Sequence, residues 1–167
     1  WAMAAAATEA LLALPELLGN VTSAEALERW IVGHSDSWKL AEEYGDDRKT
    51  QIVSLLVKYV QGFELQGRAR LSGQAWPCMR LCLDALRLCL RERDRGCQAV
   101  CTVAFVTTLL DVAEHADGAG TGASTMALRT SVNLLYRNQT LLPAAASEAN
   151  LLPRLRAILV SRRPLSL

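Results

Sequence analysis

The fold is decided by the stretch CLDALRLCLRERDRGCQAVCTVAFVTTLLDV, residues 82–112, whose apolar pattern returns 46 positions later in LRTSVNLLYRNQTLLPAAASEANLLPRLRAI, residues 128–158. In this alignment Leu86 pairs with Val132, and Leu109 pairs with Leu155. The apolar positions agree although the residue identities do not. Within each stretch apolar residues recur at intervals of three and four, which is the period of an amphipathic helix. The pattern therefore predicts successive helical units that stack on one another.

The composition of the 167-residue chain favours helix over strand. Leu (29) and Ala (25) are abundant, whereas Val and Ile together number only 14, and β-branched residues are the ones that favour strands. Hydrophobic residues make up 51% and charged residues 21%, as in ordinary globular domains. At this length we expect a single domain, residues 1–167.

Helical periodicity and helix-end signals divide the chain into about eight helices and no strand. The expected helices cover residues 2–18, 22–32, 48–61, 76–93, 97–114, 124–136, 143–148 and 150–160. Asp46 or Asp47 is expected to cap the third helix, and Ser124 or Thr125 the sixth. We therefore predict an all-α fold of stacked helical repeats, with a non-repeating helical bundle as the alternative.

The net charge of +1 is too small to indicate a nucleic-acid-binding protein. The charge is unevenly divided, with −5 over residues 1–65 and +6 over residues 66–167. Fifteen of the 18 basic residues are Arg, a bias that suits the recognition of carboxylates. No apolar run free of charge reaches the length of about 20 residues that a transmembrane helix needs, so we expect no membrane insertion.

The five cysteines, an odd number, all lie in or beside predicted helices: Cys78, Cys82, Cys89, Cys97 and Cys101. Such a pattern is not typical of a secreted disulfide framework, and we expect a cytoplasmic protein. Two pairs spaced at i, i+4 offer four thiolates for zinc. Their neighbours are Leu and Val, however, so we expect core packing and no metal. Two glycosylation sequons, which begin at Asn20 and Asn138, leave secretion as the alternative.

No segment carries the signature of a catalytic or nucleotide-binding site. The glycine-rich residues 118–122 follow a predicted helix and lack the Gly-Lys-Ser/Thr ending of a phosphate loop. His34, Ser35 and Asp36 are consecutive, and consecutive residues do not converge as a catalytic triad does. We therefore expect no enzymatic activity, no cofactor and no small-molecule substrate.

The second unit resembles an armadillo repeat. The segments ALRTSVNLL (127–135) and EANLLPRL (148–155) are similar to the "AL…NL" and "EA…LP.L..L" helices of that family, and residues 83–112 match more loosely. The resemblance implies an armadillo/HEAT-like right-handed superhelix that binds other proteins.

A narrower resemblance covers most of the chain. HSDS (34–37), DRK (47–49) and LLV (55–57) are similar to the opening of the synembryn family, the armadillo-type exchange factors and chaperones for heterotrimeric G-protein α subunits. ALRLCLRERDR (85–95) is similar to a later segment of that family and departs from it over residues 89–92. This resemblance implies the N-terminal fragment of a longer solenoid, acting as a guanine-nucleotide releasing factor and chaperone in G-protein signalling. An armadillo-type Hsp70 nucleotide exchange factor and a structural adaptor without nucleotide linkage are the alternatives.

The candidate partner-binding residues form a polar stripe over two of the predicted helices. Arg129, Asn133 and Arg137 recur at four-residue intervals and so share one helix face. The alignment at 46 positions places Asn133 on Arg87 and Arg137 on Arg91. Because Arg binds carboxylates bidentately, the stripe predicts a groove for an acidic peptide or a free carboxylate. The armadillo resemblance implies that Asn133 contacts the peptide backbone.

The alternative for this stripe is a solvated face. In that case Arg80, Asp84 and Arg87 form local ion pairs worth a few tenths of a kcal/mol each.

Overall fold

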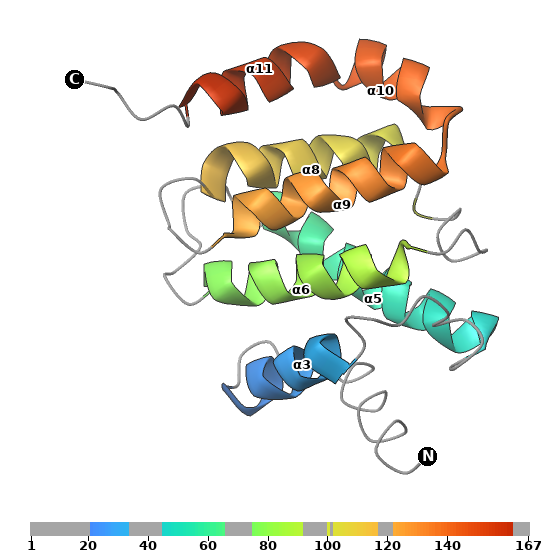
Figure 1. The fold of residues 1–167 in the computed structure, drawn as a ribbon, viewed down its shortest axis with the longest axis vertical. Helices are drawn as coiled ribbons and strands as arrows, with labels where there is room; N and C mark the ends of the chain where they lie inside the picture. The colour runs from blue at the N-terminus through green and yellow to red at the C-terminus, as the bar shows by residue number, and fades with distance from the viewer. Residues whose placement is uncertain are drawn as a thin grey trace.

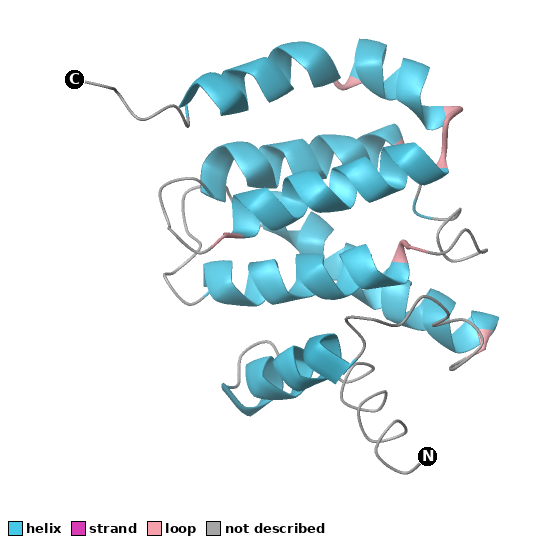
Figure 2. Ribbon diagram, in the orientation of Figure 1, coloured by secondary structure: helices cyan, strands magenta, loops and turns pink. Residues whose placement is uncertain are grey.

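A computed structural model describes residues 21–33, 45–65, 75–91, 100, 102–116 and 122–161. These residues form seven helices and no strand: α3 (Val21–Gly33), α5 (Asp46–Leu65), α6 (Ala75–Cys89), α8 (Val103–His115), α9 (Ala123–Arg137), α10 (Leu141–Glu148) and α11 (Leu151–Ser161). The predicted all-α class is therefore confirmed for this part of the chain (Figure 2). The expected helix over 2–18, the loop residues 34–36, Cys97 and Cys101 lie outside the described residues.

The helices follow one another along the long axis of the molecule in two alternating directions (Figure 1). Helices α3, α6 and α9 run one way, whereas α5, α8 and α11 run the other way. Helix α6 packs against α3, α5 and α9, and α8 packs against α5, α9, α10 and α11. Helices α6 and α9 lie side by side and parallel, as expected for corresponding helices of two consecutive units.

The core is formed by one face of each helix. In α6 the predicted apolar face is confirmed, with Cys82, Leu86, Cys89 and Leu90 buried and Cys78 half-buried. Helix α8 buries most of its surface because it has neighbours on several sides, and Phe105, Leu109 and Leu110 are fully enclosed there: their relative exposure is 0%. No helix in the described ranges combines the length and the apolarity that a membrane span requires.

The expected continuous helix over 97–114 is interrupted at Thr102: Val100 is helical, Thr102 is not, and α8 begins at Val103. The expected start at residue 97 lies outside the described residues. Thr102 is extended, with φ −122° and ψ 151°, and its Oγ1 accepts a hydrogen bond from the backbone N–H of Phe105 at 3.1 Å. A threonine in this position satisfies one of the free N–H groups of the first turn. The capping side chain therefore fixes the start of α8.

The predicted caps of α5 and α9 are also wrong, because both helices begin after a glycine in the left-handed region. Gly45 (φ 79°) precedes Asp46, and its carbonyl accepts a hydrogen bond from the backbone N–H of Lys49 at 3.1 Å. Gly122 (φ 75°) precedes α9 in the same way. Ser124 instead donates a hydrogen bond to the carbonyl of Ala113 at 2.6 Å, which ties α9 to α8.

Helix α6 ends at Cys89 rather than at residue 93, since the chain turns at Leu90 and Arg91. Helix α5 continues to Leu65 beyond the predicted end at residue 61. The remaining boundaries in the second unit agree with the prediction to within about two residues, the usual uncertainty of a helix end.

Candidate protein-binding site

The candidate site lies where α9 packs against α6. Two side chains of α9 form hydrogen bonds across this contact. The hydroxyl of Thr130 is buried and donates to the carbonyl of Leu83 at 3.1 Å, and also lies 2.8 Å from the carbonyl of Met126. One turn further along, Nδ2 of Asn133 donates to the carbonyl of Arg87 at 3.1 Å. These bonds hold the predicted polar stripe of α9 beside that of α6.

Asn133 satisfies a backbone group that the end of a helix leaves open. The last carbonyls of an α-helix have no intrahelical donor, and the N–H of Arg91 bonds to Leu88 instead of Arg87. The Asn133 amide supplies a donor to the Arg87 carbonyl, so one of its two amide hydrogens is engaged within the chain. Its predicted role toward a peptide backbone therefore falls to the remaining hydrogen and the amide oxygen.

An open depression of about 370 Å³ lies along this contact. It is lined by Arg87, Thr125, Leu128, Arg129, Val132 and Asn133. Three of the five predicted partner-binding residues, Arg87, Arg129 and Asn133, thus line one surface. The depression combines cationic, amide and apolar groups, and a surface of this composition suits a peptide rather than a compact polar metabolite.

The two arginines of this depression differ in their pairing. The guanidinium of Arg87 bonds to Oδ1 of Asp84 through Nη2 at 2.6 Å and Nε at 2.9 Å, and both side chains are largely covered. Arg129 is exposed, and within the described part of the chain its guanidinium has no hydrogen bond or ion pair. Arg129 is therefore the cation best placed to meet an incoming carboxylate.

Of the local ion pairs expected for a solvated face, the pair of Arg87 with Asp84 is present. Arg80 instead pairs with Glu28 of α3, at an N–O distance of 3.8 Å. Arg91 is half-buried after the end of α6 and does not line the depression. Arg137 is the last residue of α9, and its side chain lies outside the described residues.

Sequence reasoning missed the apolar half of this surface. Val132 and Tyr136, one turn apart on α9, are 63% and 73% exposed. Thr125, Leu128 and Val132 line the depression at helical spacing. The alignment had placed Val132 among the core positions. The available signal was the polar stripe itself, because Arg129 and Asn133 flank Val132 on the same face of α9.

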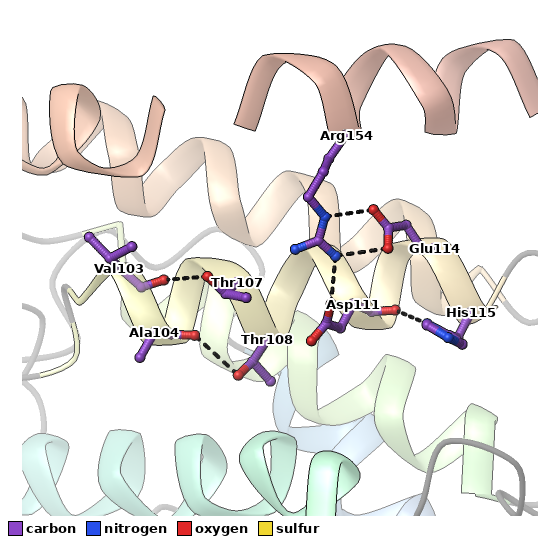
Figure 3. Close-up of polar contacts among 8 residues, drawn as sticks. All are labelled: Val103, Ala104, Thr107, Thr108, Asp111, Glu114, His115 and Arg154. Atoms are coloured by element: carbon purple, nitrogen blue, oxygen red, sulfur yellow. Dashed lines mark hydrogen bonds and ion pairs between the residues drawn. The ribbon is translucent and has the colours of Figure 1, made fainter. Parts of the chain in front are cut away.

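A second polar cluster joins α11 to α8 (Figure 3). Arg154 donates through Nε to Oε1 of Glu114 at 2.6 Å, and through Nη2 to Oε2 of Glu114 at 2.8 Å and to Oδ1 of Asp111 at 2.5 Å. The hydrogen bond to Glu114 raises the pKa of Arg154 above its ordinary value; Asp111 adds to this, and burial opposes it. A fixed cation shared by two carboxylates holds helices together and does not transfer protons.

His115 is the last residue of α8, and its Nδ1 lies 2.7 Å from the carbonyl of Asp111 (Figure 3). This places an imidazole over the carbonyl end of the helix dipole, where a cation is favoured.

The thiols of α6 face the core. Burial raises the pKa of Cys82 and that of Cys78, which is the less buried of the two. Burial also raises the pKa of the neighbouring Tyr59. Among the described residues no three His, Cys, Asp or Glu side chains gather as metal ligands. Cys82 and Cys89 are buried, which agrees with their prediction as core residues, whereas Cys78 is half-buried.

We predict that iodoacetamide modifies Cys78 before Cys82 and Cys89 in the native protein. The thiolate is the reactive form, and a raised pKa lowers the thiolate fraction at any given pH below that of a free cysteine. Cys82 combines this effect with full burial, whereas Cys78 is half-buried. Peptide mass spectrometry over time measures the order, and equal rates for Cys78 and Cys82 would contradict the packing described.

Comparisons of this chain with protein-family models, with curated proteins and with solved structures found no match.

Proposed function

We propose that this chain is a non-enzymatic protein-binding module that holds a peptide segment of its partner against the α6/α9 depression. The observation that carries the proposal is the meeting of Arg87, Arg129 and Asn133 with exposed Val132 in one open surface. An unpaired arginine beside exposed apolar side chains is typical of protein-interaction surfaces.

The finer architecture that we propose is an armadillo-like right-handed superhelix. The support comes from the parallel contact of α6 with α9 and from the hydrogen bond between Asn133 and Arg87, two residues 46 positions apart. That separation equals the offset at which the apolar patterns of the two units align. Corresponding residues of neighbouring repeats lie side by side in stacked repeats.

The partner that we propose first is a G-protein α subunit, on the strength of the synembryn resemblance. The module would bind the C-terminal segment of the α subunit, whose free carboxylate suits Arg129. Preferential affinity for the nucleotide-free state would drive nucleotide release, since a ligand shifts an equilibrium only by its differential binding. On this proposal the protein works in the cytoplasm.

The test is direct binding of the purified chain to immobilised partners, measured by biolayer interferometry. We expect binding to a nucleotide-free α subunit and at least about tenfold weaker binding to the nucleotide-loaded form. The same chain should accelerate release of a fluorescent GDP analogue. Binding to Hsp70 alone would favour the chaperone exchange factor, and binding of both nucleotide states with equal affinity would reduce the chain to an adaptor.

A further inference from the structure

Most of the exposed large apolar side chains lie on α9, α10 and α11, and Val132 of α9 lines the α6/α9 depression. Six of the seven found among the described residues belong to the C-terminal unit: Val132, Tyr136, Leu142, Leu152, Leu159 and Val160. The seventh, Val32, lies on α3 at the opposite end of the stack (Figure 1). Stacked helical units bury such faces against a neighbour, so both ends carry the character of a contact surface.

The α11 end is an apolar face with one cation. An open depression of about 720 Å³ is lined by Leu152, Pro153, Arg156, Ala157, Val160 and Ser161. Only Leu151 and Ile158 of this helix are buried, while Leu152 is 69% exposed. The guanidinium of Arg156 is exposed and has no ion pair within the described ranges.

The α3 end carries an acid and a base beside one exposed large apolar side chain. Its depression of about 630 Å³ is lined by Glu28, Arg29, Val32 and Gly33. Val32 is 69% exposed. The Glu28 side chain is 60% exposed, and its contact with Arg80 is long at 3.8 Å. Arg29 has an interaction within the chain, and Glu28 has its long contact with Arg80. The exposed Glu28 carboxylate is the group of this end that can also receive a cation from a neighbour.

We propose that the chain associates head to tail, with the α11 end of one copy seated on the α3 end of the next. Helices α3, α6 and α9 are parallel and successive along the long axis, so a second copy added in this way continues the existing order of helices. The contact brings Val32 toward Leu152 and Val160, and Glu28 toward Arg156. Apolar burial supplies the attraction, and the charge pair sets the register.

A symmetric contact between two α11 helices is disfavoured by the same residues. Arg156 stands at the middle of α11, which spans Leu151–Ser161. In an antiparallel pair of identical helices the middle residues meet at the two-fold axis. Two unpaired arginines would then face each other, and like charges at a contact cost free energy. Glu28 at the α3 end avoids this repulsion. A heterologous contact of this kind does not close and can extend beyond two copies.

The test is sedimentation velocity on the full chain from low to high micromolar concentration. We expect a weight-average mass that rises with concentration. Arg156→Glu and Glu28→Lys should each weaken the association at least about tenfold. Each change removes a complementary charge pair and puts two like charges in contact. Lys58→Glu, an exposed change on α5 outside both depressions, is the control and should associate as the unaltered chain does.

Mixing the two single variants provides the decisive arm. The reversed α11 end of Arg156→Glu fits the reversed α3 end of Glu28→Lys, and the unaltered α11 end of Glu28→Lys fits the unaltered α3 end of Arg156→Glu. Only a variant's contact with its own kind joins like charges. The mixture should therefore recover the association that each variant alone has lost, with the two variants alternating along the assembly. If Glu28→Lys fails to fold by circular dichroism, Val32→Asp tests the α3 end alone. An unaltered chain that stays monomeric, or variants that associate as it does, would overturn the proposal.

Discussion

Replacing Phe105 with alanine should lower the free energy of unfolding by about 3–5 kcal/mol. Phe105 is fully enclosed on α8, the helix that packs against α5, α9, α10 and α11. The lost ring contacts and the cavity left among these helices both contribute to the cost. Because a domain of this kind is stable by only about 5–15 kcal/mol, Phe105→Ala should shift the urea midpoint strongly.

The matched control is Leu142→Ala on α10. Leu142 is 47% exposed, and exposed substitutions usually change stability by no more than about 0.5 kcal/mol. Urea unfolding followed by far-ultraviolet circular dichroism measures both variants. Similar costs for Phe105→Ala and Leu142→Ala would mean that α8 is not the centre of the core.

Replacing Arg154 with alanine should lower the free energy of unfolding by about 2–3 kcal/mol, between the values for exposed and for fully buried ion pairs. The Arg154 side chain is 18% exposed, and that of Asp111 is 8% exposed. The change removes the charge that both Asp111 and Glu114 use. The packing of α11 otherwise depends on buried Leu151 and Ile158. In the variant, the amides of α11 should therefore lose protection from hydrogen exchange before those of the other helices.

Arg156→Ala is the control for Arg154→Ala, because Arg156 is an exposed arginine of the same helix without an ion pair in the described part of the chain. It should leave stability nearly unchanged. Since the hydrogen bond to Glu114 raises the pKa of Arg154, the charge of the arginine is present at neutral pH. On the alkaline side its contribution to stability is lost as the pH rises past the ordinary range of an arginine. Equal costs for the two variants, measured by urea unfolding at dilute protein, would show that the cluster contributes nothing specific.

The sequence predicted those parts of the fold that depend on local periodicity. The apolar face of α6 and the order of helices in the second unit follow from residues three and four apart. The alignment of Asn133 on Arg87 also anticipated a physical neighbour, because the two residues are joined by a hydrogen bond. A sequence offset carries this information when units stack in parallel.

The parts that the sequence did not predict depend on backbone conformation or on distant partners. Gly45 and Gly122 begin helices through a left-handed conformation, a role less common there than capping by Asp or Ser. Arg154 meets Asp111 and Glu114, residues 40 to 43 positions away, and nothing local specifies that pairing. The exposure of Val132 depends on which helices cover α9, and periodicity alone does not reveal this.

On the function proposed above, the α6/α9 depression binds the protein partner. The most direct test of this proposal is the affinity of the double variant Arg129→Glu/Val132→Asp for the proposed partner, a nucleotide-free G-protein α subunit. Lys58→Glu is the control for reversal of an exposed charge. Both changes fall on exposed positions of α9, so helix content should be retained. We predict at least about tenfold weaker binding, or about 1.4 kcal/mol, for the double variant and unchanged binding for the control. A folded double variant that binds as tightly as the unaltered chain would contradict the account.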